Sequence, residues 1–302
     1  MTTSTSAPTL VILAAGLGSR YGDVKQIAGV GPDGEWLLEY AVHDALAAGF
    51  AQIVMVIRAE LRDVLAERLA PRIDGRADLR FIEQTFDNVP SGCRAPIGRK
   101  KPLGTGHALW CCAPWLTGPF AVVNADDYYG RHAFGLLEAH FHRQRNPAMV
   151  GYRLDATLSP HGGVNRGVCR IDPHGHLQDV TEYLDIADRD GALSGTAPDG
   201  TREPLTQDTV VSLNCWGLTP ALLPDLERGL REFLARAGAS DEYFLPHAIA
   251  THLAAHGETL SVLSTNDTWL GLTYPDDRAR VVNAIAALHA SHAYPTPLWS
   301  HA

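Results

Sequence analysis

The stretch LAAGLGSRYGDVKQ, residues Leu13–Gln26, joins an apolar run to a loop that holds three glycines, one arginine and one lysine. The run TLVILAA that leads into it is typical of a strand buried on both faces of a parallel sheet. Glycines let backbone N–H groups approach phosphate oxygens closely, and Arg20 and Lys25 supply cations for them. Taken alone, the loop fits a phosphate-binding nest and a glycine-rich turn with two solvated cations equally well.

Two common nucleotide-binding motifs do not fit this loop. The dinucleotide motif G-x-G-x-x-G matches at Gly16 and Gly18, but Tyr21 stands at the third glycine position. The P-loop motif G-x-x-x-x-G-K-[ST] occurs nowhere in the chain. The loop therefore belongs to neither of these classes.

Around the loop, apolar strand-like runs alternate with helical patterns. In the first half, strands are predicted at 9–15, 52–57, 79–84 and 119–129, and helices at 36–49, 60–70 and 106–116. This βαβ alternation predicts an α/β protein with a largely parallel sheet and helices on both faces.

The second half is less regular. Strands are predicted at 148–154, 167–172, 210–218 and 260–265, and helices at 224–238, 244–257 and 276–292. Residues 185–209 are polar and rich in turn residues, which predicts an insertion loop or a loose hairpin. We expect a disordered tail at 1–8 and one domain at 9–302, divided into a nucleotide-binding half (9–130) and a sugar-phosphate-binding half (131–302).

The composition excludes several classes of function. The chain has 302 residues and a formal net charge of −9, whereas proteins that bind a nucleic-acid backbone usually carry a basic surface. Its five cysteines are odd in number and have no CxxC spacing, which indicates reduced thiols. No apolar run reaches the roughly 20 residues that cross a bilayer. We therefore expect a cytoplasmic protein with small-molecule substrates and no nucleic-acid or membrane partner.

Three stretches resemble motifs of the sugar-1-phosphate nucleotidyltransferases, also called NDP-sugar pyrophosphorylases. LAAGLGSR at Leu13–Arg20 is similar to the strand and loop of their signature. PLGTGHAL at Pro102–Leu109 resembles the base-packing segment of the N-acetylglucosamine-1-phosphate uridylyltransferases, and VVNADDYYG at Val122–Gly130 the strand end with a magnesium-binding aspartate. The resemblance implies a Rossmann-like nucleotidyltransferase fold with a mixed, mostly parallel central sheet and helices on both faces.

The resemblance also implies roles for individual residues. The catalytic residues that it implies are Arg20, Lys25 and Asp126, with Asp126 also a ligand of Mg²⁺. The residues that it implies in nucleotide binding are Leu13, Ala14, Ala15, Gly16, Gly18, Ser19, Gly104 and Thr105. Those that it implies in contacts with the phosphorylated substrate are Asn124, Glu182 and Asn214.

The chain departs from the family in its second half. In the family's E-K-P motif a lysine directly follows the glutamate, whereas Tyr183 follows Glu182 here. A phosphate-binding cation is therefore missing or is replaced by another residue, such as Arg166 or Arg170.

The second magnesium ligand is also altered. The family's aspartate aligns near DEYFLPHAI, where His247 occupies the equivalent position. Because Mg²⁺ prefers oxygen ligands, we expect Glu242 in this role, with Asp241 and His247 as alternatives. Asp127, next to Asp126, either reaches the metal or caps the following turn.

The implied reaction is NTP + sugar 1-phosphate → NDP-sugar + pyrophosphate, by Mg²⁺-assisted in-line attack on the α-phosphate. The LGTGHA match favours UTP or another pyrimidine nucleotide. The short spacing from Arg20 to Lys25 resembles molybdopterin nucleotidyltransferases and, with Tyr183, leaves a second hypothesis open: a nucleotidyltransferase, for example a cytidylyltransferase, for a polyol, amino-alcohol or cofactor phosphate. A third hypothesis is a non-catalytic nucleotide-sugar sensor or partner subunit. The sequence determines neither the base, nor the acceptor, nor whether the chain forms a homo-oligomer.

Overall fold

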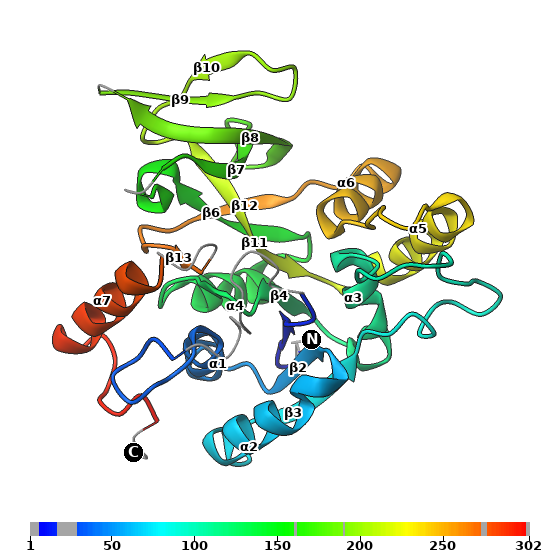
Figure 1. Cartoon of the computed structure of the whole chain (residues 1–302), viewed down its shortest axis with the longest axis horizontal. Helices are drawn as coiled ribbons and strands as arrows, with labels where there is room; N and C mark the ends of the chain where they lie inside the picture. The colour runs from blue at the N-terminus through cyan, green and yellow to red at the C-terminus, as the bar shows by residue number, and fades with distance from the viewer. Residues whose placement is uncertain (1–5, 17–28, 160–161, 190, 273–276, 300–302) are drawn as a thin grey trace.

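The computed structural model describes residues 6–16, 29–159, 162–189, 191–272 and 277–299. Within these residues, 11 strands form one large mixed sheet that runs through the molecule (Figure 1). The chain has the expected Rossmann-like α/β fold, with a parallel core and helices on both faces.

The parallel part of the sheet comes from the first half of the chain. Its strands lie in the order β4-β1-β2-β3, and all pair in parallel. Their bounds are β1 Thr9–Leu13, β2 Gln52–Ile57, β3 Asp78–Glu83 and β4 Phe120–Asn124. Because these strands are parallel, their carboxyl ends meet at one edge, where ligands bind in open α/β sheets.

The antiparallel part comes from the second half. Strand β11 joins the two parts, because it pairs with β4 near its carboxyl end, with β7 near its amino end, and with β6 near both ends. The strands of this part are β6 Ala148–Arg153, β7 Val164–Ile171, β8 Leu177–Arg189, β9 Ala192–Thr196, β10 Arg202–Pro204, β11 Val210–Leu218 and β12 Ser261–Ser264. A separate two-stranded sheet pairs β5 (Asp127–Tyr128) with β13 (Leu270–Gly271).

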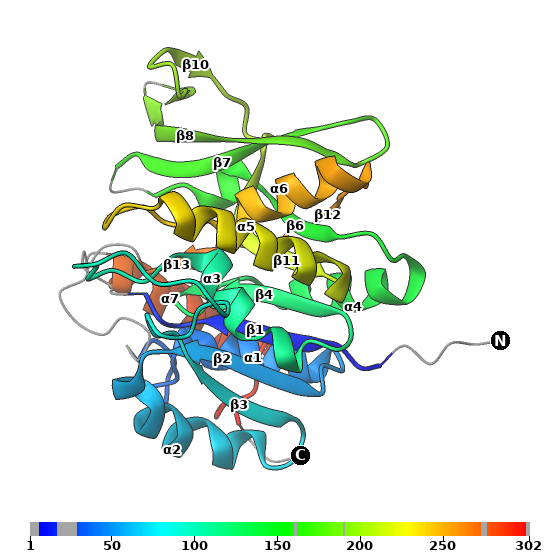
Figure 2. The ribbon, with the colours of Figure 1, turned by 90° about the vertical axis from the view of Figure 1, so that its right-hand side faces the viewer.

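Residues 185–209 extend the end of the large sheet. They comprise the last part of β8 together with β9 and β10, which pair antiparallel in sequence order. Figure 2 shows these strands at the end of the molecule opposite β3. The polar segment is thus a hairpin-like extension rather than a structureless loop.

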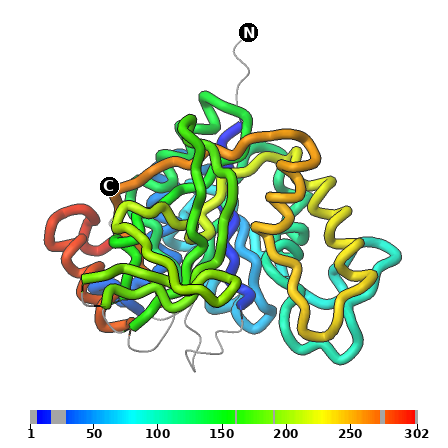
Figure 3. Tube along the Cα trace, turned by 90° about the horizontal axis from the view of Figure 1, so that it is seen from above, coloured from blue at the N-terminus to red at the C-terminus, as the bar shows by residue number. Residues whose placement is uncertain are grey.

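Helices cover both faces of the sheet. The helices on one face are α1 Leu37–Ala47, α2 Arg62–Ile73 and α4 Ala133–Arg143, and those on the other face are α3 Thr105–Cys111, α5 Leu223–Arg236 and α6 Leu245–His256. Helix α7 (Asp277–Ala290) packs near β13. In Figure 3, β7–β10 lie between α5 and α6 on one side and α7 on the other. Short 3₁₀ turns lie at Ala59–Leu61, Ala113–Trp115, Leu154–Thr157 and Pro220–Leu222.

Each face of the sheet buries its own apolar cluster. Alternate residues of β1 point to opposite faces, so Leu10 and Ile12 pack with α1 and α4, whereas Val11 packs with α3. All three side chains are fully buried, as the apolar run predicts. This double burial fixes where β1 ends and therefore where the glycine-rich loop begins.

Candidate active site

A cavity of about 240 Å³ lies where β1 and β3 end. The segments that line it are far apart in the sequence, and its lining residues are Leu13, Ala15, Gly16, Gln84, Lys101, Pro102, Gly104, Thr105, Ala108 and Glu242. The LAAG and LGTG stretches therefore meet at the carboxyl edge of the parallel strands. This is the position at which the resemblance implies a nucleotide.

The LAAG stretch contributes unequally to the cavity. Leu13, Ala15 and Gly16 line it, whereas Ala14 is fully buried in the core and donates its backbone N–H to the oxygen of Val56 at 2.8 Å. The other implied residues of this loop, namely Gly18, Ser19, Arg20 and Lys25, lie outside the described residues. Their roles remain predictions.

Gln84 lines the cavity and was not predicted as a site residue. It directly follows β3, and its Nε2 donates to the backbone oxygen of Gly104 at 3.0 Å and to Nδ1 of His107 at 3.1 Å. Nε2 of His107 lies 2.6 Å from the oxygen of Asn88, so it is the protonated nitrogen and Nδ1 is the acceptor. Burial lowers the pKa of His107, which favours this neutral tautomer.

This network fixes the orientation of the Gln84 amide. Both hydrogens of its NH₂ group have partners, so the polar atom left for a ligand is Oε1, which accepts no hydrogen bond from the described part of the chain. The cavity therefore offers an acceptor at this point. The sequence carried one signal of this role: a polar side chain at the end of a buried parallel strand.

The glycines of LGTGHA are required by a close backbone approach. Gly104 has a φ of +109°, and a Cβ there would lie 2.5 Å from the backbone oxygen of Tyr243. A Cβ on Gly106 would lie 2.7 Å from the ring of Tyr243. Thr105 accepts the backbone N–H of Leu245 through its hydroxyl at 2.9 Å, at the start of α6. The motif thus joins the cavity wall to the segment before α6, and Gly104 and Thr105 also line the cavity.

A buried arginine organises the outer wall of the cavity. Arg99 donates to the backbone oxygens of Lys101 at 2.7 Å and Pro102 at 2.6 Å. Burial lowers its pKa, and the charges of Glu242 and Asp241 oppose that shift. Arg99 therefore holds residues 101–102 beside the acidic segment at 241–242.

Glu242 lies in the wall of this cavity, together with Lys101. Asp126 is not among the lining residues. The structure therefore gives Glu242 a place on the cavity wall, and its role as the second metal ligand stays a prediction.

Asp126 lies at the carboxyl end of β4, next to β1. Leu13, the last residue of β1, lines the cavity, and its backbone oxygen accepts the N–H of Ala125 at 3.1 Å. Asp126 therefore directly follows a residue that is bonded to the cavity wall. The side chain of Asp126 is partly exposed, whereas Asp127 is buried and accepts from Nδ2 of Asn124 at 2.9 Å and the hydroxyl of Tyr129 at 3.2 Å. Asp127 is thus held inside the turn. The amide of Asn124, which was predicted to contact the substrate, donates its hydrogen bond to Asp127 instead.

In the second half, Arg166 lies close to the same strand end. Its guanidinium interacts electrostatically with the carboxylates of Asp127 and Glu182. It donates a hydrogen bond to the hydroxyl of Thr157 at 3.2 Å and lies over the ring of Trp269, 4.6 Å from the ring centroid. Burial lowers the pKa of Arg166 to about 10, so it remains a cation at neutral pH. Burial also raises the pKa of Glu182, an effect that Arg166 opposes.

The other residues predicted near the acceptor differ in exposure, and Tyr183 is partly buried. Tyr183, in the place of the family's lysine, donates its hydroxyl to Glu203 at 2.5 Å. Arg170 is exposed on β7. Asn214 is exposed at an irregularity in β11 between Ser212 and Trp216, with a φ of +60° that asparagine tolerates better than most residues.

Comparisons with known proteins agree with this geometry. Residues 10–93 match the model of the MobA-like NTP transferase domain. The fold is similar to that of the inositol-1-phosphate CTP transferase from T. maritima, with a TM-score of 0.62 and 15% identity over 94% of this chain and 97% of that one. It is also similar to a candidate glucose-1-phosphate thymidylyltransferase from Bacillus anthracis in complex with a sucrose, with a TM-score of 0.61 and 13% identity over 92% of this chain and 95% of that one. No curated protein matches the sequence significantly.

Among the described helices, none is both long and apolar enough to cross a bilayer. The chain therefore has the fold of nucleotidyltransferases, and the domain match at 10–93 supports a nucleotidyltransferase that acts on NTPs.

Proposed function

We propose that this protein is a Mg²⁺-dependent nucleotidyltransferase that transfers the nucleotidyl group of an NTP to a sugar 1-phosphate and releases pyrophosphate. The observation that carries the proposal is the convergence of separate segments at one edge of the sheet. Leu13, Gly16, Gln84 and Gly104 line one cavity, and Asp126 follows the neighbouring strand end. The domain match over 10–93 covers the first three of these residues.

The cavity is the proposed subsite for the nucleobase. Its glycine-bearing walls let a flat ring approach the backbone, and Oε1 of Gln84 accepts a hydrogen bond from the edge of the base. The N3–H of uracil or the N4 amine of cytosine supplies such a donor. The N6 amine of adenine and the N1–H of guanine are also donors, so the proposal of a pyrimidine NTP rests on the LGTGHA resemblance, and the test below includes all common bases.

The donor set near β4 fits magnesium. Mg²⁺ binds through one or two carboxylates together with waters and substrate phosphates, and the carboxylate of Asp126 is partly exposed at a strand end. We propose Asp126 as its protein ligand, with Glu242 as the second. When bound, the ion neutralises charge on the triphosphate.

The rest of the mechanism rests on positioning by cations of this chain. The acceptor phosphate is already ionised at neutral pH, so its oxygen needs no general base, and catalysis requires in-line alignment and charge stabilisation. Arg20 and Lys25 are proposed to contact the leaving pyrophosphate and the α-phosphate. Arg166, which is partly buried and interacts with the charges of Asp127 and Glu182, is the proposed replacement for the missing lysine of the family.

A polyol phosphate is the second candidate for the acceptor. Tyr183 is bonded to Glu203, so this position offers no cation for a sugar phosphate. The similar structure from T. maritima is described as an inositol-1-phosphate CTP transferase, and inositol is a polyol. Both observations favour testing polyol phosphates beside sugar phosphates.

The experiment is a pyrophosphate-release screen with Mg²⁺. It combines CTP, UTP, dTTP, ATP and GTP with hexose 1-phosphates, inositol 1-phosphate and linear polyol phosphates, and identifies the products by mass spectrometry. The proposal predicts turnover with a pyrimidine NTP and a sugar phosphate. Turnover with a polyol phosphate alone would replace the acceptor, and binding of NTP without turnover in any combination would contradict the proposed function.

A further inference from the structure

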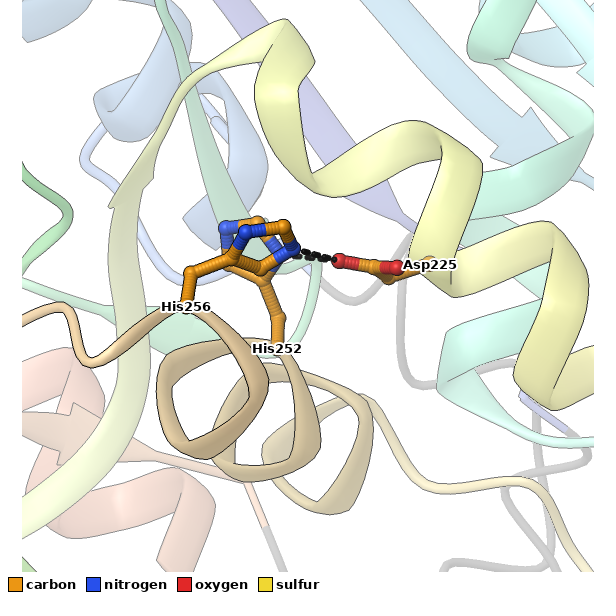
Figure 4. A group of neighbouring side chains, drawn as sticks. All are labelled: Asp225, His252 and His256. Carbon is orange, nitrogen blue, oxygen red and sulfur yellow. Dashed lines mark hydrogen bonds and ion pairs between the residues drawn. The ribbon is translucent and has the colours of Figure 1, made fainter.

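A compact group of three side chains joins α5 to α6, outside the cavity lining. Asp225 comes from α5, and His252 and His256 come from successive turns of α6 (Figure 4). Oδ2 of Asp225 lies 2.6 Å from Nδ1 of His252 and 2.7 Å from Nε2 of His256. One donor atom from each residue lies within 4.8 Å of the other two. Among the described residues, this is the one such group of three.

The geometry of the group matches a transition-metal site. Residues four apart on a helix lie on the same face, so the two imidazoles converge on the carboxylate of the neighbouring helix. Zinc binds imidazole nitrogen and carboxylate oxygen at about 2.0–2.2 Å with tetrahedral geometry, which places donor atoms roughly 3.3 Å apart. The carboxylate, now at 2.6 and 2.7 Å, must therefore separate from the two rings by about 0.6–0.7 Å. His256 is half exposed, so its ring has room to separate from Asp225, whereas Asp225 and His252 are both buried and separate only by rotation of their side chains.

The partners around the three donors also match a metal site. Nη2 of Arg228 binds Oδ1, the other oxygen of Asp225, at 2.6 Å. Nε2 of His252, the nitrogen that points away from Asp225, lies 3.7 Å from a carboxylate oxygen of Glu258. Metal-ligating histidines commonly direct their second nitrogen to a carboxylate, and ligating carboxylates are themselves hydrogen-bonded. An ordinary hydrogen-bonded triad requires neither of these outer contacts.

We propose that Asp225, His252 and His256 bind one Zn²⁺ ion, with a water molecule or an external ligand in the fourth position. Each imidazole binds through the nitrogen that now faces Asp225, and the proton of each neutral ring moves to its other nitrogen. For His252 that nitrogen faces a carboxylate oxygen of Glu258 at 3.7 Å, which accepts a hydrogen bond once it moves closer.

The chemistry of the donors favours zinc over magnesium at this position. Two imidazoles suit Zn²⁺, Ni²⁺ or Cu²⁺, whereas Mg²⁺ prefers oxygen ligands and retains its water. The ion would fasten α5 to α6. Helix α5 also accepts the hydroxyl of Tyr243 on the backbone oxygen of Leu226 at 3.2 Å, and Tyr243 packs against Gly104 in the cavity wall. The site thus links α5 to α6 and is separate from the proposed catalytic magnesium.

The test is calorimetric titration of ZnCl₂ into the full chain after removal of metal by a chelator. The proposal predicts binding of one Zn²⁺ per chain with a dissociation constant below about 1 μM that an excess of MgCl₂ does not weaken, and a higher melting temperature with zinc. His256→Gln removes a direct ligand and raises the dissociation constant by about 100-fold. Glu258→Gln raises it by about tenfold, because loss of outer partners costs 10–100-fold. His256 is half exposed, so His256→Gln retains the fold, which circular dichroism verifies.

The matched control is His142→Gln. His142 forms an exposed pair with Glu138 on α4 at 2.6 Å and belongs to no group of three donors among the described residues. The control variant is expected to bind zinc like the wild type. Equal zinc affinity of the wild type and His256→Gln, or binding weaker than about 100 μM, would overturn the proposal and leave Asp225, His252 and His256 as a hydrogen-bonded triad. Neither outcome depends on nucleotidyltransferase activity.

Discussion

The two halves of the molecule position their functional groups by different means. In residues 9–130, parallel strand ends and glycines bring the backbone close to the cavity, so the wall depends on positions such as Gly16 and Gly104. In residues 131–302, antiparallel strands present individual long side chains, such as Arg166 and Glu182. A backbone-built subsite fixes a recurring ligand such as a nucleotide. Where side chains form a subsite, substitution of a single residue can change which ligand the subsite binds.

The largest expected effect concerns the proposed metal ligand at the boundary of the halves. Asp126→Asn removes the anionic oxygen and is expected to lower kcat about 10³-fold, which corresponds to about 4 kcal/mol of transition-state stabilisation. Pyrophosphate release measures this change. Asp63→Asn, an exposed substitution in the first turn of α2, is the control that should retain full activity. Wild-type turnover by Asp126→Asn would remove this residue from the chemistry.

The second prediction tests the backbone-built wall. Gly104→Ala is expected to lower the free energy of unfolding by about 3 kcal/mol, because the methyl group meets the Tyr243 backbone and φ is positive. Gly200→Ala has a similar positive φ, with no described atom within 4 Å of its Cβ, and is expected to cost about 1 kcal/mol. Urea denaturation measures both values. Equal losses would show that the close approach to Tyr243 contributes nothing.

The third prediction tests the side-chain-built subsite. Arg166→Met is expected to lower kcat/KM for the phosphorylated acceptor by about 30-fold, or 2 kcal/mol, because it removes a buried cation, while the KM for NTP stays within about twofold. Arg170→Met, exposed on the same strand, is the control. If both KM values rise together in Arg166→Met, the residue supports the whole site rather than the acceptor.

The smallest expected effect concerns the base. Gln84→Leu removes the acceptor Oε1 and leaves Nδ1 of His107 without its donor, so we expect about a tenfold higher KM for the preferred NTP and a weaker preference among bases. Gln178→Leu, on exposed β8, controls for the substitution itself. An unchanged base preference would place base recognition elsewhere in the cavity.

The difference between the halves also explains what the sequence could predict. Buried parallel strands have continuous apolar runs, and close backbone approaches require glycine, so β1 and the LGTGHA stretch were visible as patterns. Gln84 was missed because its role depends on His107 and Gly104, which lie about 20 residues further along the chain. The surroundings of Arg166 depend on Asp127, Glu182 and Trp269, which no local spacing brings together.

The group of Asp225, His252 and His256 was missed for a related reason. His252 and His256 have the spacing of helical metal ligands, but the third donor comes from another helix, 27 residues before His252. Only the packing of α5 on α6 shows that the three converge. The spacing of two histidines on one helix was the signal available in the sequence.

The central claim, that the chain transfers a nucleotidyl group, is tested most directly by following the α-phosphate. The measurement incubates the protein with Mg²⁺, an NTP labelled at the α-phosphate and the unlabelled acceptor found in the screen, and then separates the products. The account predicts that all transferred label appears in the nucleotide-linked acceptor and none in pyrophosphate. Label that accumulates as free NMP or NDP, or remains in the NTP, would contradict nucleotidyl transfer by this protein.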